Sequence, residues 1–171
     1  GSGPDRLAAV LTGRVTAAVI NPPSNFIAEK KGLAVVADVA QMGLVFQHTG
    51  AATTRKYIRE NSDIVRRYVK SHVEAVHRIY TDKEATVKTL GKYMGSNVDR
   101  EILEKSRENI LTEALLPKKQ IPSLEGLQTV LDDIGQRDPR AKAAKPEQFV
   151  DFTFIRELEQ SGFIDALYKK K

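Results

Sequence analysis

The apolar positions of the first forty residues follow two different spacings. Residues 4–11 have helical spacing, and their inner face is formed by Leu7, Val10 and Leu11. Two further segments, Val15–Ile20 and Leu33–Val39, are apolar at nearly every position, which is typical of parallel strands covered by helices. A short helix is predicted between them, over residues 24–31. The order of elements up to residue 40 is therefore predicted to be αβαβ.

The sharpest break in this pattern is Asn21-Pro22-Pro23, directly after the first apolar segment. Proline does not continue a strand, and either Ser24 or Asn25 is suited to cap the following helix. In α/β proteins, ligands bind where a strand ends and a helix begins, because free backbone N–H groups point into the crevice there. We therefore interpret this junction as the border of a small-molecule site.

From residue 55 onward, helical spacing continues almost without interruption. The clearest helix is Ser62–Tyr80. Further helices are predicted to begin at Thr81–Glu84, Asn97 or Asp99, Ser123, and Asp151 or Thr153. Between the two regions, residues 43–46 are a third short apolar segment, and residues 51–54 are compatible with another strand.

Composition leaves the class of protein open but excludes several kinds of site. The chain has 171 residues, of which 41% are hydrophobic and 29% charged, with no cysteine. It therefore has no disulfide, thiolate metal site or cysteine nucleophile. The sequence shows no signal peptide and no transmembrane run. It begins without Met, so we expect a processed, tagged or truncated chain, in which Gly1-Ser2 is either native or vector-derived.

The net charge of +5 raises the question of nucleic-acid binding. Much of this charge lies in residues 55–70 and in the three lysines that end the chain. The basic residues of 55–70 alternate with apolar positions of a helix, and no set of stacking aromatics lies among them. We therefore interpret them as a solvated helix face and expect no nucleic-acid partner.

Catalytic motifs are absent from the sequence. It has no phosphate-binding glycine loop, no dinucleotide fingerprint and no nucleophile elbow around a serine. His72 and His77 are five residues apart and do not share a helix face, and His72 is predicted to pack in a core. His48 lies among small residues and is a candidate ligand contact. We expect a protein that is not an enzyme and that holds no metal or cofactor.

Several segments resemble the carboxyl-terminal half of solute-binding proteins of ABC importers, in the nitrate/taurine/sulfonate and thiamine-pyrimidine-precursor group. The first is Gly-Ser-Gly-Pro-Asp-Arg-Leu through Asn-Pro-Pro in residues 1–23, where Thr16 replaces an aspartate usual in the family. The residues that match a second family pattern are Asn61, Val65, Tyr68, Val69 and Lys70. The last helix, which ends at Ser161-Gly162-Phe163-Ile164, fits the family's terminal helix. Pyrimidine-precursor synthases of this fold use a cysteine-rich motif, so that activity is not expected.

The resemblance implies a truncated α/β fold of the type II periplasmic-binding-protein class. Residues 1–45 would complete the ligand-closing lobe, and residues 46–171 would return to the other lobe and cover it with helices. The implied role is capture of a small polar or anionic solute in an interlobe cleft, for delivery to a membrane permease. The implied location is the periplasm or another extracytoplasmic compartment.

The candidate ligand-binding residues lie at three places along the chain. They are Ser2 and Gly3 at the first helix start, Asn21, Pro22 and Ser24 at the break, and Gln47, His48 and Thr49 at the return crossover. Asn21 and Gln47 would hydrogen-bond polar ligand atoms, while the helix N-termini would favour a carboxylate or sulfonate.

Two alternatives remain open. One is an effector-sensing or scaffolding module on the same fold, without transport. The other is a purely helical interaction module, which requires that Val15–Ile20 and Leu33–Val39 are not strands. In a truncated α/β protein, an uncovered sheet edge would favour self-association.

Overall fold

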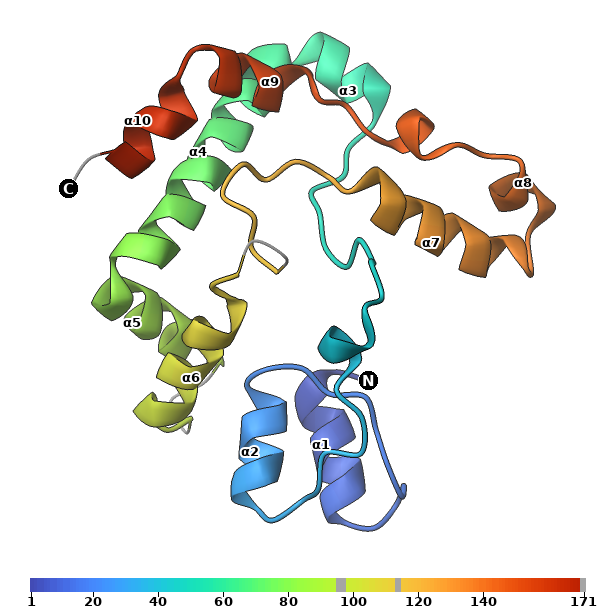
Figure 1. The fold of residues 1–171 in the computed structure, drawn as a ribbon, viewed down its shortest axis with the longest axis vertical. Helices are drawn as coiled ribbons and strands as arrows, with labels where there is room; N and C mark the ends of the chain where they lie inside the picture. Colours follow the sequence, from blue (N-terminus) through green and yellow to red (C-terminus); the bar gives the residue numbers. More distant parts are fainter. Residues whose placement is uncertain (95–97, 113–114, 170–171) are drawn as a thin grey trace. The chain divides into compact units, whose positions relative to one another are not determined.

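The computed structural model describes residues 1–94, 98–112 and 115–169, and in these ranges every regular element is a helix (Figure 1). The elements of the first half are α1 (Gly3–Leu11), α2 (Ser24–Lys30), the 3-10 turn η1 (Val39–Met42), α3 (Arg55–Glu60), α4 (Ser62–Thr81) and α5 (Lys83–Met94). Those of the second half are α6 (Arg100–Ile110), α7 (Leu124–Gly135), α8 (Pro139–Lys142), the 3-10 turn η2 (Pro146–Phe149), α9 (Thr153–Gln160) and α10 (Phe163–Lys169).

The chain forms two compact units, each made of two separate stretches of sequence. Unit 1 consists of Gly1–Asp38 and Arg78–Leu115, and unit 2 of Val39–His77 and Leu116–Lys171. The boundary between the stretches of 39–77 and 78–115 lies inside α4. The sequence analysis divides the chain between two lobes of a larger solute-binding protein, residues 1–45 and 46–171. This division stays a prediction.

The expected α/β fold class is wrong for this structure, because no strand occurs in the described part of the chain. Neither Val15–Ile20 nor Leu33–Val39 is a strand, and residues 43–46 and 51–54 are irregular as well. The two longer segments are also not buried: Val19 is 68% exposed and Val36 is 89% exposed. An apolar run becomes a buried strand only when neighbouring strands pair with its backbone, and no such neighbour accompanies these segments in the described residues.

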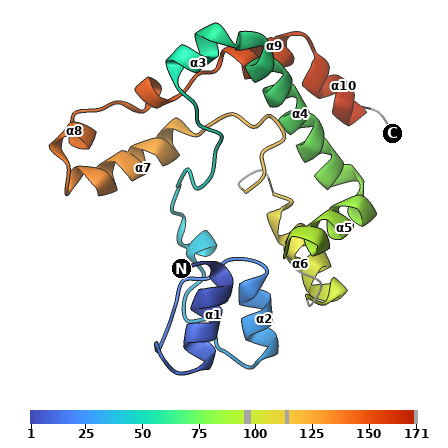
Figure 2. The same ribbon diagram turned by 180° about the vertical axis from the view of Figure 1, so that it is seen from behind.

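Unit 1 contains α1, α2, α5 and α6, together with the last turn of α4. Helix α1 packs against α2, α2 against α6, and α6 against α5, as the ribbon shows (Figures 1 and 2). The buried apolar residues of this unit are Leu7, Phe26, Ala28, Val87, Ile102 and Leu103. The predicted inner position Leu7 is therefore confirmed, whereas Leu11, predicted on the same face, is 42% exposed. Packing of α2 on α6 joins the first stretch of the unit to the second.

Glycines follow the ends of the first two helices. Gly13 (φ +69°) and Gly32 (φ +81°) both adopt the left-handed conformation, which glycine reaches without steric cost. The start of α2 differs from the prediction that Ser24 or Asn25 caps it. Its N-cap is Pro23, which makes no side-chain capping bond, and Ser24 is the first helical residue.

A single residue, Asp82, separates α4 from α5. Its carboxylate oxygen Oδ1 accepts a hydrogen bond from the Ala85 N–H (2.9 Å), so Asp82 caps α5. The sequence predicts a cap at Thr81, and the observed cap, Asp82, lies one residue later. Glu84, the other member of the predicted capping pair, forms an ion pair with Arg100 instead. The Ala85 hydrogen bond, supported by Arg78, holds the pKa of Asp82 below its ordinary value.

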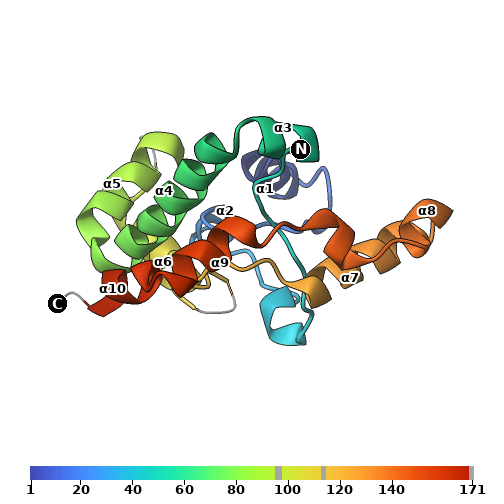
Figure 3. The same cartoon turned by 90° about the horizontal axis from the view of Figure 1, so that it is seen from above.

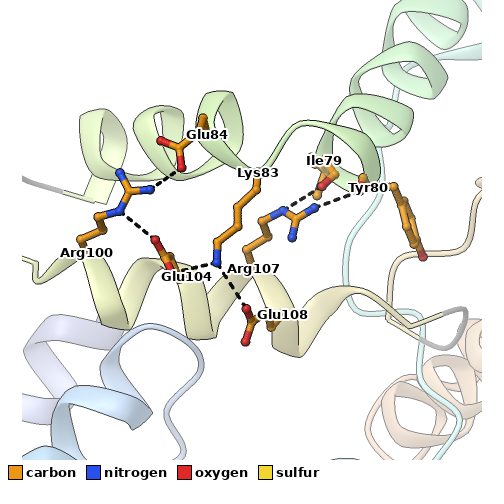
Figure 4. A network of polar contacts seen from close by, with 8 residues as sticks. All are labelled: Ile79, Tyr80, Lys83, Glu84, Arg100, Glu104, Arg107 and Glu108. Carbon is orange, nitrogen blue, oxygen red and sulfur yellow. Dashed lines mark hydrogen bonds and ion pairs between the residues drawn. The ribbon is translucent and has the colours of Figure 1, made fainter. Parts of the chain in front are cut away.

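A buried arginine of α6 also contacts the junction between α4 and α5. Arg107 is 8% exposed, and its Nε and Nη2 donate to the carbonyl oxygens of Ile79 and Tyr80, each at 2.9 Å (Figure 4). These carbonyls belong to the last turn of α4, where no helical N–H is left to bond them. The guanidinium therefore satisfies two orphan acceptors and sits at the negative end of the helix dipole.

Unit 2 has its core where α9 and α10 lie along α4 (Figure 3). The buried residues at its centre are Val73, Ile155 and Ile164, surrounded by half-buried apolar neighbours. The helix predicted to begin at Asp151 or Thr153 is confirmed as α9, which buries Ile155 and ends at Ser161-Gly162. It is not the last helix, however, because Gly162 (φ +73°) turns the chain directly into α10.

The prediction that His72 packs in a core is wrong. His72 is exposed on α4, where its ring stacks on Tyr68 and its Nε2 lies 3.0 Å from the Gln120 side-chain oxygen. The core face of this part of α4 is instead formed by Val69, Val73 and Val76. Consecutive residues of a helix point in different directions, so His72 lies outside the face on which the adjacent Val73 is buried.

Helix α7 packs against α8, η2 and the segment that contains Gln47. Ser123 caps the helix as predicted, since its Oγ accepts from the Gly126 N–H at 2.9 Å. Gly126 is buried, and a Cβ at this position would lie 2.6 Å from the Gln47 backbone nitrogen. A side chain on residue 126 would thus displace backbone rather than a flexible side chain.

Replacing Arg107 with methionine is expected to lower the free energy of unfolding by about 2 kcal/mol, because two partly buried carbonyls lose their charged donor. The measurement is urea unfolding followed by circular dichroism. Arg100→Met is the matched control: it removes only exposed ion pairs and should change stability far less. Equal stability of the Arg107→Met variant and the unmodified protein would contradict the capping role.

Asp82→Asn is expected to preserve stability at neutral pH, since asparagine also caps helices well. In the unmodified protein the lowered pKa of Asp82 adds stability above the ordinary aspartate pKa, and this stability is lost as the pH falls through the folded-state value. The variant should therefore lose less stability between about pH 5 and pH 2. Parallel acid-unfolding curves for the two proteins would contradict this assignment.

Gly126→Ala tests the close approach of Gln47 to α7. Alanine favours a helix by up to about 1 kcal/mol, but overpacking against backbone costs about 1–3 kcal/mol, so the net effect should be destabilising. Gly91→Ala on α5 is the control, because its Cβ would meet only the flexible Leu103 side chain at 3.3 Å. We expect a lower urea midpoint for Gly126→Ala alone, and an unchanged or raised midpoint would contradict the contact.

Candidate functional site

Five of the eight predicted ligand-binding residues lie within unit 1, at the place where α1 meets α2. Gly3 opens α1 and faces the buried Ser24 at the start of α2. A Cβ on Gly3 would lie 3.1 Å from the Ser24 Oγ, so the absence of a side chain lets the two helix starts approach closely. This approach brings Gly3 next to the turn that contains Asn21, Pro22 and Pro23.

The surface at this meeting point is hollowed into an open concavity of ≈ 500 Å³. Gly3, Asn21, Pro22 and Ser24 line it, and Ser2 does not. The remaining described lining residues are Pro4, Arg6, Leu7, Ala8, Leu11, Pro23, Ile27, Tyr93, Met94 and Val98. Four of the eight candidates therefore share one hollow with an end of α5.

The N–H of Ser2 is not available to a ligand in this structure. It donates to the Asp5 carboxylate at 2.9 Å, while the Ser2 Oγ accepts from the Asp5 N–H at 3.4 Å. This reciprocal pair is a capping box. The hydroxyl and backbone hydrogen bonds from Ser2 lower the pKa of Asp5 below its ordinary value. The start of α1 thus already carries a carboxylate, which leaves little attraction there for a second anion.

Positive charge in the concavity comes from a residue that sequence reasoning missed. Arg6 is the one charged residue among the described residues that line the hollow. Its Nε is buried and has no hydrogen-bond partner in the described part of the chain. Arg6 precedes Leu7 and lies at the edge of the buried stripe of α1, a position that does not distinguish it in the sequence from a solvated helix residue.

A second concavity, of ≈ 470 Å³, lies between α5 and α6 and contains none of the predicted residues. Its charged lining residues are Glu84, Lys88 and Arg100. Arg100 is engaged by two carboxylates, those of Glu84 and Glu104 (Figure 4). These hydrogen-bonded pairs hold the pKa of Arg100 above its ordinary value. The pairing indicates a structural role for this arginine.

The other three predicted residues belong to unit 2 and line neither concavity. Gln47 is already used inside that unit: its Oε1 accepts from the Ser123 N–H at 2.8 Å, and its Nε2 donates to the Thr49 carbonyl at 2.7 Å. His48 and Thr49 are exposed. The described contacts of Gln47 therefore join a loop to the start of α7.

The basic residues of 55–70 have contacts typical of a solvated helix face. Arg66 pairs with Glu157 at 2.9 Å, and Arg67 pairs with Asp63 at 3.0 Å on the same helix. Arg55 donates to the Gln148 carbonyl at 2.7 Å.

None of the described helices combines the length and hydrophobicity needed to cross a membrane. The described residues also include no cluster of three or more side chains suited to hold a metal ion.

Comparison with known proteins gives one distant relative. A protein of Brachyspira hyodysenteriae with the provisional name ABC transporter periplasmic binding protein is 20% identical over 122 residues. The match includes 71% of this chain and 35% of the relative, so the chain spans about a third of that protein's length. No family model matches the chain, and no solved structure does. The match shows a distant relation to ABC-transporter solute-binding proteins and does not single out the nitrate/taurine/sulfonate and thiamine-pyrimidine-precursor group.

Proposed function

We propose that this chain is part of an extracytoplasmic solute-binding protein of an ABC importer, and that the unit 1 concavity contributes to its solute site. The supporting observation is that four residues chosen from the sequence as ligand contacts line the same hollow. The distant relative supports the solute-binding role. Delivery to a membrane permease and binding without catalysis are parts of the same proposal.

The finer assignment to the nitrate/taurine/sulfonate and thiamine-pyrimidine-precursor group is also proposed. It is supported by residues 1–23 and by the pattern around Asn61 and Tyr68. Taurine, nitrate and an aminopyrimidine are accordingly the first solutes to test. Binding is measured by calorimetric titration of the full chain, and heats equal to dilution for every solute in the panel would count against the group.

A second candidate function is a helical interaction module. It requires that Val15–Ile20 and Leu33–Val39 are not strands, and in the structure they are not. Such a module would bind a protein partner and would show no solute binding. An effector-sensing or scaffolding role would instead keep solute binding but lack a permease partner. Solute titration thus separates the helical interaction module from the other two roles, both of which include solute binding.

Asn21→Ala is expected to weaken binding of whichever panel solute binds best by about 3- to 10-fold, the effect of one lost hydrogen bond. Asn21 is exposed at the rim of the hollow, so the thermal unfolding midpoint should not change. Asn109→Ala removes an exposed asparagine of α6 that does not line the hollow and serves as the control. Unchanged affinity of the Asn21→Ala variant would remove this residue from the site.

A further inference from the structure

Helix α4 has a second apolar face, which the core of unit 2 does not use. The core side of the helix buries Val73 and Val76, and Val69 packs beside them. Away from this stripe, Ile64 is 47% exposed and Tyr68 is 55% exposed. Large exposed apolar side chains one turn apart on a helix are typical of a surface that packs against a further helix.

The exposed face has the spacing of a coiled coil. It consists of Ile64, Tyr68, Ser71 and Ala75, which are all exposed and follow one another in steps of four, three and four residues. This is the a and d spacing of a heptad, with Tyr68 and Ala75 at position a and the other two residues at position d. The face is uncharged over this length and has room for one more helix.

The side chains of this face are complementary in size to the same face turned around. Two large residues come first along α4, and two small ones follow. In an antiparallel pair of identical helices, each a position lies opposite a d position, and every contact occurs twice. Tyr68 of one copy then lies against Ser71 of the other, and Ile64 lies against Ala75. A parallel pair would instead stack two tyrosines in one layer and leave two alanines facing each other in another.

The charges beside the face follow the same rule. Arg67 and Glu74 both occupy heptad position g. In an antiparallel pair the g positions of the two helices lie side by side, and the register that sets Tyr68 against Ser71 also sets Arg67 against Glu74. The pair therefore gains two interhelical ion pairs. In a parallel pair a g residue faces position e, so Arg67 would face a histidine and Glu74 an isoleucine.

Both charged groups are available for contacts between two copies. Glu74 is exposed and takes part in none of the ion pairs found among the described residues. Arg67 pairs with Asp63 on the same helix at 3.0 Å, and the two side chains are 71% and 73% exposed. An exposed pair of this kind contributes at most about 1 kcal/mol, and an arginine has five N–H donors. The Asp63 contact therefore leaves Arg67 able to bind a second carboxylate.

We propose that α4 packs antiparallel against α4 of a second copy of this chain, through the face formed by Ile64, Tyr68, Ser71 and Ala75. Arg67 of each copy pairs with Glu74 of the other. The occupant is a second copy because the face carries its own complement in both size and charge. This surface is not the sheet edge considered in the sequence analysis, and the inference does not depend on solute binding.

The first test measures association and its dependence on the two charges. A contact of two heptads is smaller than a standard interface of about 1,600 Å², so dimers should appear in sedimentation velocity only at about 0.1–1 mM protein. Arg67→Glu and Glu74→Arg should each weaken association by about tenfold, because both ion pairs become repulsive. Combining the two substitutions should restore it. Lys56→Glu on α3 is the matched control, since it reverses an exposed residue of another i,i+4 pair away from this face.

The second test determines the orientation of the two helices. The chain has no cysteine, so each variant carries a single thiol. Ile64→Cys and Ala75→Cys place that thiol at opposite ends of the face. Oxidation of an equal mixture with diamide should give mainly the mixed disulfide dimer, identified by intact mass spectrometry, and each variant alone should give little. Circular dichroism of every variant shows whether its helices are retained.

Three results would overturn the inference. The first is a constant monomer mass up to 1 mM protein. The second is association that Arg67→Glu and Glu74→Arg leave unchanged, or that Lys56→Glu weakens equally, because another surface would then form the contact. The third is disulfide formation by each cysteine variant alone but not by the mixture, which is the result expected of parallel helices.

Discussion

The candidate site depends on the close contact between the first turns of α1 and α2. Gly3 approaches Ser24 closely, and a Cβ at residue 3 would lie 3.1 Å from the serine hydroxyl oxygen. Once the two turns are in contact, Arg6 comes to the edge of the apolar interface and the Asn21-Pro22-Pro23 turn forms its rim. A side chain at residue 3 would require the buried Ser24 to shift by a few tenths of an ångström.

Charged groups elsewhere in unit 1 serve the fold rather than a ligand. Arg107 bonds the last carbonyls of α4, Asp82 caps α5, and Arg100 pairs with carboxylates of α5 and α6. Each of these groups has found an acceptor or donor within the unit. Arg6 differs because its buried Nε has none in the described residues. This contrast, rather than the number of positive charges, distinguishes a candidate ligand group from structural ones.

The helices could be predicted from the sequence because their signals are local. Helical spacing defines α4, Ser123 caps α7, and Gly13 and Gly32 end α1 and α2, all within a few residues of each element. The strands could not be predicted correctly, since an apolar run such as Val15–Ile20 becomes a strand only if other strands pair with it. Within the site, proline and glycine marked the turn and the close approach, whereas Arg6 resembled an ordinary solvated residue of a helix.

The central claim is that a small solute binds in the hollow between the starts of α1 and α2. The most direct test is amide chemical-shift mapping of isotopically labelled protein during titration with the proposed solutes taurine, nitrate and an aminopyrimidine. The account predicts saturable shifts at Gly3, Arg6, Asn21 and Ser24, while exposed residues of unit 2 such as Ser71 stay unchanged. Shifts centred on other residues, or none at saturating solute, would contradict it.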